Sequence, residues 1–265
     1  MRPHFKIFLL LAVIVTATLL APQAQQQADK KAKRDLSNFP VADSWTQESP
    51  DPIKREKRNL KSKKYNSRHS PRITESSDEI FTNSEWARGL AALPVENSDA
   101  VIVGDIVTAE AYVSDDHSEI YSEFVVRISK VLKDAGTTPI NDVDSIIVER
   151  SGGRLRLPSG KVVVSSTSNQ DMPRVGSRYV LFLTHLSANG GSYENDFHIL
   201  TGYELRGGKV FPLDKLASKH PINTYAGADE ASFLRELSSA LAHSEVESGL
   251  CFFRGESADR RSVGE

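Results

Sequence analysis

An alternation of apolar and polar side chains between Ile120 and Leu132 is the feature that most limits what this chain can fold into. The residues that share the apolar side are Ile120, Phe124, Val126, Ile128 and Leu132, and those on the polar side are Tyr121, Glu123, Arg127, Ser129 and Lys133. A period of two is typical of a strand with one buried face in an antiparallel sheet. The segment therefore predicts a β-sheet with a covered side.

Further short apolar runs with turn signals between them surround this segment. The strands predicted from them are 100–113, 145–149, 154–157, 161–165, 178–186, 197–205 and 209–211, and Gly207-Gly208 predicts a hairpin between the last two. Two helices are expected: a short one over 84–93, before Pro94, and a longer one over 229–243 with an apolar stripe of Phe233, Leu234, Leu237 and Leu241. The sequence therefore predicts a mainly β fold, a small antiparallel OB-like barrel or a sandwich, closed by one C-terminal helix.

Gly104-Asp105 interrupts the first long apolar run, SDAVIVGDIVTAEAYVS (98–114). One interpretation is a bend or bulge in a continuous strand, and the other is a loop that presents Asp105 to a ligand. A nucleotide site would need a glycine-rich loop followed by a helix, and neither GxGxxG nor GxxxxGK[ST] occurs. Because Ile106–Ala109 continues the β pattern, we expect the bend.

The N-terminus has the order of a secretory signal. Arg2, His4 and Lys6 precede the uncharged run Ile7–Ala21, and a segment rich in Ala and Gln follows. As a helix, 15 residues span about 22 Å, less than a bilayer core of about 30 Å. We therefore expect a cleaved signal peptide over 1–24 and a secreted or periplasmic protein without a transmembrane helix, a retained anchor being the alternative.

Charge divides the rest of the chain into two parts. Residues 25–75 carry 13 basic and 7 acidic side chains, a net +6, whereas residues 76–265 carry 18 and 28, a net −10. Residues 25–77 have few spaced apolar positions, which predicts a disordered basic linker before a barrel domain at 83–254 and a flexible tail at 255–265. Lys54–Arg72 could contact an anionic envelope polymer or lipid, or it could simply be solvated. That segment has a single tyrosine, which gives no series of rings for bases to stack on, and the chain is expected to be exported. No nucleic-acid partner is therefore expected.

Cys251 is the only cysteine, so no intramolecular disulfide can form and the core must hold by burial. The cysteine is either a small buried apolar residue or a free thiol.

Motifs of hydrolytic enzymes are missing: neither GxSxG nor HExxH occurs. No cofactor, metal or catalytic residue is therefore predicted, and a ligand is expected at the rim loops 114–119, 133–144 and 187–196. The predicted contact residues are Asp115, Asp116, His117, Tyr193, Asp196 and His198. An alternative is a metal-assisted hydrolase that uses His185, Asp196 and His198, if a hairpin brings these three together.

Three segments together resemble netrin-like modules, a group that includes the tissue inhibitors of metalloproteinases. They are SDAVIVGDIV (98–107), FVVRISKVLKD (124–134) and VGSRYVLFL (175–183), within residues 98–205. The resemblance implies an OB-type barrel. Those inhibitors bind the protease zinc through an N-terminal cysteine, and no cysteine precedes Cys251 here, so the resemblance carries over the fold and not that route of inhibition.

These observations favour an exported, non-enzymatic binding module whose partner is a protein or an envelope polymer. Two other functions stay open at this point: the metal-assisted hydrolase and an inhibitor of an exported protease.

Overall fold

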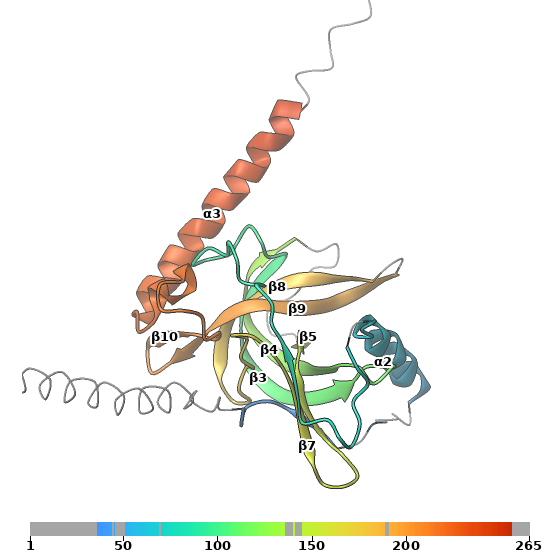
Figure 1. The fold of residues 1–265 in the computed structure, drawn as a ribbon. Helices are drawn as coiled ribbons and strands as arrows, with labels where there is room; N and C mark the ends of the chain where they lie inside the picture. Colours follow the sequence, from blue (N-terminus) through green and yellow to red (C-terminus); the bar gives the residue numbers. More distant parts are fainter. Residues whose placement is uncertain are drawn as a thin grey trace, which may run out of the picture. The chain divides into compact units, whose positions relative to one another are not determined.

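A ring of five strands forms the centre of the protein in the computed structural model (Figure 1). The model describes residues 36–43, 45, 51–68, 70–135, 140, 145–188 and 191–255. The ring strands are β3 (Ala100–Val113), β4 (Ile120–Asp134), β5 (Ser145–Ser151), β8 (Arg178–Ala188) and β9 (Gly191–Arg206). They pair in the order β3–β4–β5–β9–β8 and back to β3. The fold is therefore the mainly β barrel that the sequence predicts.

One pair in this ring is parallel. Strands β5 and β9 run in the same direction, with Val148 opposite Phe197, whereas the other four pairs are antiparallel. A closed ring with an odd number of strands cannot alternate direction all the way round, so one parallel pair is unavoidable. The resulting chain order around the ring, first–second–third–fifth–fourth, is that of an OB-type barrel.

Gly104 lies inside β3 and faces the backbone of β4 at close range. A Cβ atom at Gly104 would lie 2.6 Å from Cγ1 of Val126 and 2.7 Å from the carbonyl oxygen of Arg127. The β3–β4 register shifts between Val103 and Gly104 and again between Ile106 and Thr108. Strand β3 nevertheless continues to Val113, and Asp105 forms a partly exposed ion pair with Arg127 at 3.2 Å. The predicted bend is confirmed.

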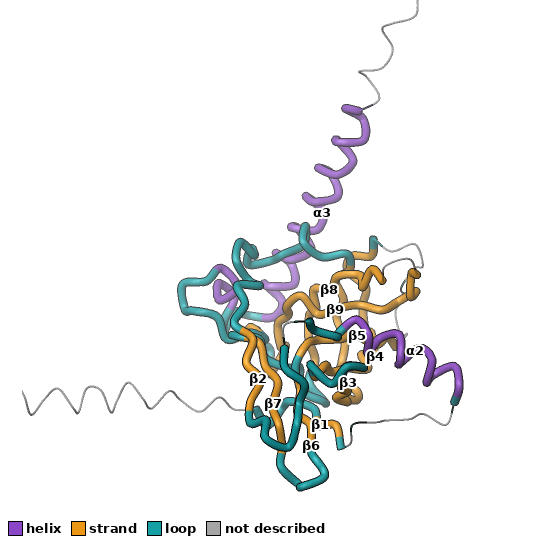
Figure 2. The backbone as a smooth tube through the Cα atoms, turned by 45° about the vertical axis from the view of Figure 1, so that its right-hand side comes forward, coloured by secondary structure: helices purple, strands orange, loops and turns teal. Residues whose placement is uncertain are grey.

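A second sheet lies beside the ring, in the order β1–β6–β7–β2 (Figure 2). Its strands are β1 (Val41–Ala42), β2 (Glu79–Thr82), β6 (Gly153–Arg156) and β7 (Val162–Thr167). Strand β1 comes from the segment predicted to be a linker, and β2 lies between that segment and the predicted domain start at 83. Each pairs with this sheet in parallel. A side chain of each of these two strands, Ala42 and Ile80, belongs to or packs on the apolar cluster between sheet and ring.

The prediction of a disordered linker over 25–77 is therefore wrong for its described part, and so is the domain start at 83. Besides β1, this part holds helix α2 (Pro52–Lys64), and the compact unit of the chain begins at Asn38. The error has a physical cause: β1 is held through backbone hydrogen bonds and α2 through charged and aromatic side chains, which leave no apolar periodicity in the sequence. The predicted signal peptide, residues 25–35, most of the 133–144 loop and most of the tail lie outside the described residues.

Helix α3 (Glu230–Gly255) packs on the ring strands β3, β8 and β9, next to β10 (Lys209–Pro212) and the short 3₁₀ helix η1 (Pro221–Tyr225). Its Phe233, Leu237 and Leu241 pack in one apolar cluster with Val180, Phe182 and Tyr203 of the ring. The helix begins where the sequence predicts and continues beyond His243, because no proline or other stop signal follows there.

The short helix predicted over 84–93 is wrong. These residues form turns, and Gly89 has a φ of +79°, which no helix accommodates. Trp86 is instead fixed by a hydrogen bond from its Nε1 to the carbonyl oxygen of Ser168 at 2.9 Å. Among the described helices, none is both long and apolar enough to cross a membrane.

Candidate functional site

Three glutamates stand side by side across three neighbouring strands of the ring. Glu110 of β3 lies opposite Glu123 of β4, which in turn lies opposite Glu149 of β5. We call these three residues the glutamate row. Their strand neighbours Phe124 and Val148 are fully buried, so by the alternation of a strand the row is on the outer face of the barrel. Like charges directly opposite one another destabilise a sheet, which makes the row costly unless cations cover it.

Helix α2 supplies the covering cation. Lys61 Nζ lies 2.7 Å from Glu149 Oε1 and 3.4 Å from Glu123 Oε1. Tyr65, just after the helix, donates a hydrogen bond of 3.0 Å from its hydroxyl to Glu149 Oε2. The side chain of Lys61 is 3% exposed and that of Glu149 is 0% exposed. The ion pair is thus buried, although it lies on the outer face of the barrel.

Aromatic rings extend the contact between α2 and the barrel. Tyr121 of β4 stacks on Tyr65 with ring centroids 4.2 Å apart, and it lies 5.6 Å from the ring of Tyr112 on β3. Arg58 of α2 places its guanidinium 4.0 Å from the Tyr112 ring centroid and donates to the Tyr112 hydroxyl at 2.8 Å. The Tyr112 hydroxyl in turn donates to Glu110. Arg58, Lys61 and Tyr65 therefore hold α2 against the row.

Burial controls protonation in this cluster. It raises the pKa of Glu123, an effect that Lys61 opposes and the neighbouring charge of Glu149 reinforces. Burial also raises the pKa of Tyr65 and Tyr121, with nearby glutamates adding to the shift. The tyrosines thus stay neutral at physiological pH, so they serve as hydrogen-bonding and stacking groups and not as nucleophiles.

A pocket of about 390 Å³ lies between α2 and the sheet. Its lining residues are Arg58, Lys61, Thr108, Glu110, Tyr112, Glu123, Val125 and Ile147. Thr108 and Glu110 are exposed, whereas Tyr112 is buried, so solvent reaches the pocket from the Glu110 side. The walls are charged or aromatic on one side and apolar at Val125 and Ile147, an arrangement typical of sites for small ligands.

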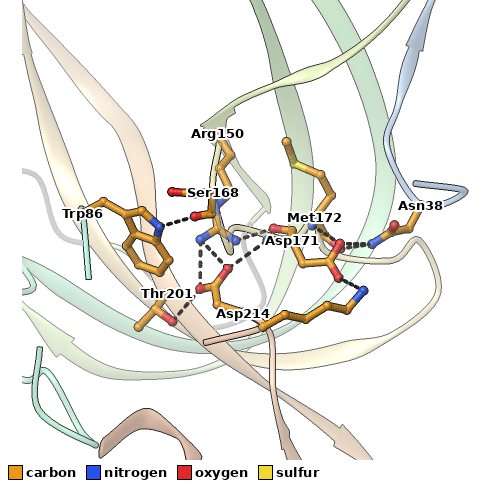
Figure 3. A network of polar contacts seen from close by, with 9 residues as sticks. Asn38, Trp86, Arg150, Ser168, Asp171, Met172, Thr201 and Asp214 are labelled. Atoms are coloured by element: carbon orange, nitrogen blue, oxygen red, sulfur yellow. Dashed lines mark hydrogen bonds and ion pairs between the residues drawn. The ribbon is translucent and has the colours of Figure 1, made fainter. Parts of the chain in front are cut away.

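A second polar cluster lies inside the fold and is drawn in Figure 3. Arg150 and Asp214, both 0% exposed, form an ion pair at 2.9 Å. The Asp214 carboxylate also accepts hydrogen bonds from the Asp171 backbone nitrogen at 3.0 Å and from the Thr201 hydroxyl at 2.8 Å. Arg150 donates as well to the Asp171 carbonyl oxygen, and its guanidinium lies 5.7 Å from the Trp86 ring centroid.

The predicted rim residues at 114–119 form a turn that is held by its own hydrogen bonds. Asp115 is exposed, and Asp116 accepts hydrogen bonds from the hydroxyls of Ser114 and Ser118. Burial works to raise the pKa of Asp116, but these hydrogen bonds outweigh it and lower the pKa. His117 has a φ of 60° and stacks on Trp45, with ring centroids 5.0 Å apart. The loop is therefore built as a tight turn that the N-terminal segment covers.

The structure does not bring the two histidines of the hydrolase alternative together. In the β8–β9 pairing, His185 lies opposite Phe197 and His198 lies opposite Thr184. Opposite residues share a face and successive residues alternate, so His185 and His198 point to opposite faces. The side chains of Tyr193 and Asp196 lie outside the described residues. Within the described part of the chain, no group of three or more His, Cys, Asp or Glu side chains is arranged to hold a metal ion.

Sequence reasoning missed the glutamate row and its helix. Glu123 is on the polar side of the strand predicted at 120–132, but its partners Glu110 and Glu149 follow only from the register of three strands. The signal for α2 was the basic segment 54–72, which stands out by charge alone. The contact between α2 and the glutamate row corresponds, in the sequence, to the division between a basic N-terminal part and an acidic barrel.

No protein-family model matches this chain, and no curated protein is similar to it in sequence.

Proposed function

We propose that this protein is an exported, non-enzymatic binding module whose glutamate row binds a basic helix of a partner protein. In this proposal α2 is the row's intramolecular occupant, and the partner's helix takes its place. The single observation that carries the proposal is the row itself, three carboxylates in register that a basic helix of the same chain covers.

The chemistry of α2 defines what such a partner would present. Seven of its 13 residues are Lys or Arg, against the single acid Glu56. Arg58 and Lys61 contact the barrel at a spacing of three residues, which places them on one helical face, and Tyr65 follows four residues after Lys61, just past the end of the helix. A partner helix would carry two cations and one aromatic residue at this spacing.

The contact is polar, which supports exchange. None of the described residues of α2 belongs to either apolar cluster of the fold. The Glu149 carboxylate that Lys61 pairs with is buried, and a cation of a partner helix could pair with it instead, so exchange of one basic helix for another leaves no buried charge unpaired. In OB-type barrels, moreover, the face of the second and third strands is a common binding surface, and here those strands are β4 and β5. The predicted signal peptide supports export of the module.

A peptide of residues 51–68 tests the proposal in trans. Fluorescence anisotropy of the labelled peptide would be measured with the wild-type chain and with an Arg58→Ala/Lys61→Ala chain, in which α2 is weakened. We expect the Arg58→Ala/Lys61→Ala chain to bind the peptide at least about tenfold more tightly than the wild-type chain does, because its own α2 competes less well for the row. Adding Glu149→Gln to that chain should reduce binding by about tenfold or more.

A control peptide with Lys61→Ala and Tyr65→Ala separates row recognition from general charge attraction. It retains most of the positive charge and should bind at least about tenfold more weakly than the parent peptide. Equal binding of the two peptides contradicts the proposal. So does an Arg58→Ala/Lys61→Ala chain that binds the parent peptide no more tightly than the wild type does. Circular dichroism of each variant chain establishes that the barrel is folded in every comparison.

A further inference from the structure

Strand β2 is the last strand of the second sheet, so one of its two edges is open (Figure 2). The carbonyl oxygen of Thr82 accepts a hydrogen bond from the backbone nitrogen of Ser168 at 2.9 Å, so the backbone of Thr82 points toward β7. Backbone groups alternate in direction along a strand, so those of Glu79 and Phe81 point away from β7. Among the described residues, neither has a backbone hydrogen bond on that side. The open edge therefore presents the N–H and carbonyl groups of both residues to another strand.

The side chains of β2 also favour a contact at this edge. Phe81 is 57% exposed, more than any other large apolar residue in the described part of the chain. Its neighbour Ile80 packs on the apolar cluster between sheet and ring, so by strand alternation Phe81 is on the outer face of the sheet. Proteins commonly protect an open edge with charged side chains or by keeping the strand short. Strand β2 is short, at four residues, but an exposed phenylalanine within it is the opposite of such protection.

The sequence of this edge is complementary to itself. If two copies pair antiparallel about a two-fold axis at Phe81, the two phenylalanines lie opposite each other and exchange both of their backbone hydrogen bonds. Glu79 of each copy then lies opposite Asn83 of the other, so each carboxylate faces an amide and not a like charge. Aromatic residues that lie opposite each other stabilise an antiparallel pair. A register centred on Ile80 would instead place Glu79 opposite Phe81, a charged side chain against an aromatic one.

We propose that this edge joins two copies of the chain: β2 of one copy pairs antiparallel with β2 of the other, with Phe81 on the two-fold axis. The four-stranded sheet of each copy then continues into that of its partner. A strand of four residues buries less surface than the roughly 1,000 Å² of a stable interface, so the dimer is weak, with a Kd of about 100 μM. The glutamate row is on the ring strands and not on this sheet, so the dimer does not depend on the exchange of α2 for a partner helix.

Sedimentation equilibrium of the full chain at concentrations from about 10 μM to about 1 mM tests this proposal. The average mass should rise with concentration from that of one chain toward that of two. Phe81→Lys places two like charges opposite each other on the axis and should raise the Kd of the dimer at least about tenfold. The matched control is Val175→Lys, which introduces the same charge at a valine that is 56% exposed and outside the second sheet, and which should leave the Kd unchanged. Both positions are exposed, so both variants should fold, and circular dichroism checks this.

Hydrogen–deuterium exchange at the same concentrations locates the contact. Amides of residues 78–83 should exchange at least about threefold more slowly at the highest concentration than at the lowest in the wild type, and at one rate in Phe81→Lys. Three results would overturn the proposal: the mass of one chain at every concentration, an equal Kd in the two lysine variants, or slowed exchange only outside residues 78–83. Failure here leaves the peptide experiment unaffected, because no residue of the second sheet belongs to the glutamate row. A failed peptide experiment likewise leaves the measurement of mass valid.

Discussion

Two buried charge clusters in the described part of the chain differ in how completely their carboxylates are satisfied. Asp214 accepts hydrogen bonds or ion pairs from Arg150, Asp171 and Thr201, and it is wholly enclosed by ring strands and the segments that cover them (Figure 3). In the glutamate row, Lys61 contacts Glu123 and Glu149, and Tyr65 bonds Glu149 alone. Glu110 stays open to solvent, and the nearby Tyr121 hydroxyl has no described partner.

This difference separates a structural cluster from a binding one. A buried charge network in which a cation, a backbone nitrogen and a hydroxyl all bind one carboxylate fixes a fold. A row of like charges that one basic helix covers incompletely retains capacity for another ligand. We therefore expect substitutions in the first cluster to change stability and those in the second to change recognition.

The largest effect is expected for Arg150→Met. Removing the guanidinium leaves the Asp214 carboxylate buried without its cation, which should lower the free energy of unfolding by about 3–5 kcal/mol. Chemical denaturation measures it. The matched control is Arg127→Met, which removes an exposed Arg–Asp pair with Asp105 and should change stability by less than about 1 kcal/mol. Similar losses in the two variants would show that the Arg150 cluster is not structural.

The next effect is a pH dependence that His198 causes. Burial, with the positive charge of Arg150 nearby, lowers the pKa of His198 from 6.5 to about 4. Between these values the unfolded chain binds a proton that the folded chain does not, so stability falls as the pH drops from about 6.5 to about 4. The full loss is about 3 kcal/mol.

Denaturation of the wild type and of His198→Gln at pH 7 and at pH 4.5 would measure this contribution as the difference between the two slopes. The variant should lose less stability on acidification than the wild type. Equal losses would mean that His198 is protonated at its ordinary pKa.

The smallest effect compares one hydroxyl from each cluster. Thr201→Val removes a donor to Asp214 and should destabilise the fold by about 1–2 kcal/mol. Tyr121→Phe removes a hydroxyl with no described partner and should leave stability unchanged or raise it by up to about 1 kcal/mol. Thermal denaturation ranks the two, and a larger loss from Tyr121→Phe would show that its hydroxyl is bonded.

The barrel could be predicted from the sequence because each of its long strands has an apolar pattern within its own segment. The alternation at 120–132 and the glycine within 98–114 are properties of single segments, and both predictions are confirmed. Strands β1 and β2 could not be predicted in this way. They are two and four residues long and gain their stability from backbone pairing with β6 and β7, which leaves no side-chain pattern.

The site was beyond sequence reasoning for a related reason. Glu110, Glu123 and Glu149 are separated along the chain, and only strand register places them in one row. The prediction of rim residues at 115–117 rests on their adjacency in the sequence, yet their loop bonds mainly to itself and to the N-terminal segment. Charge asymmetry between the two parts of the chain was the one sequence signal that anticipated their contact.

Hydrogen–deuterium exchange of α2 tests the central claim most directly, that the glutamate row holds this helix on the barrel. The wild-type chain should protect the amides of residues 55–64, and a Glu123→Gln/Glu149→Gln chain should lose that protection while β3, β4 and β5 keep theirs. An unprotected α2 in the wild type, or one equally protected in both chains, would contradict the account.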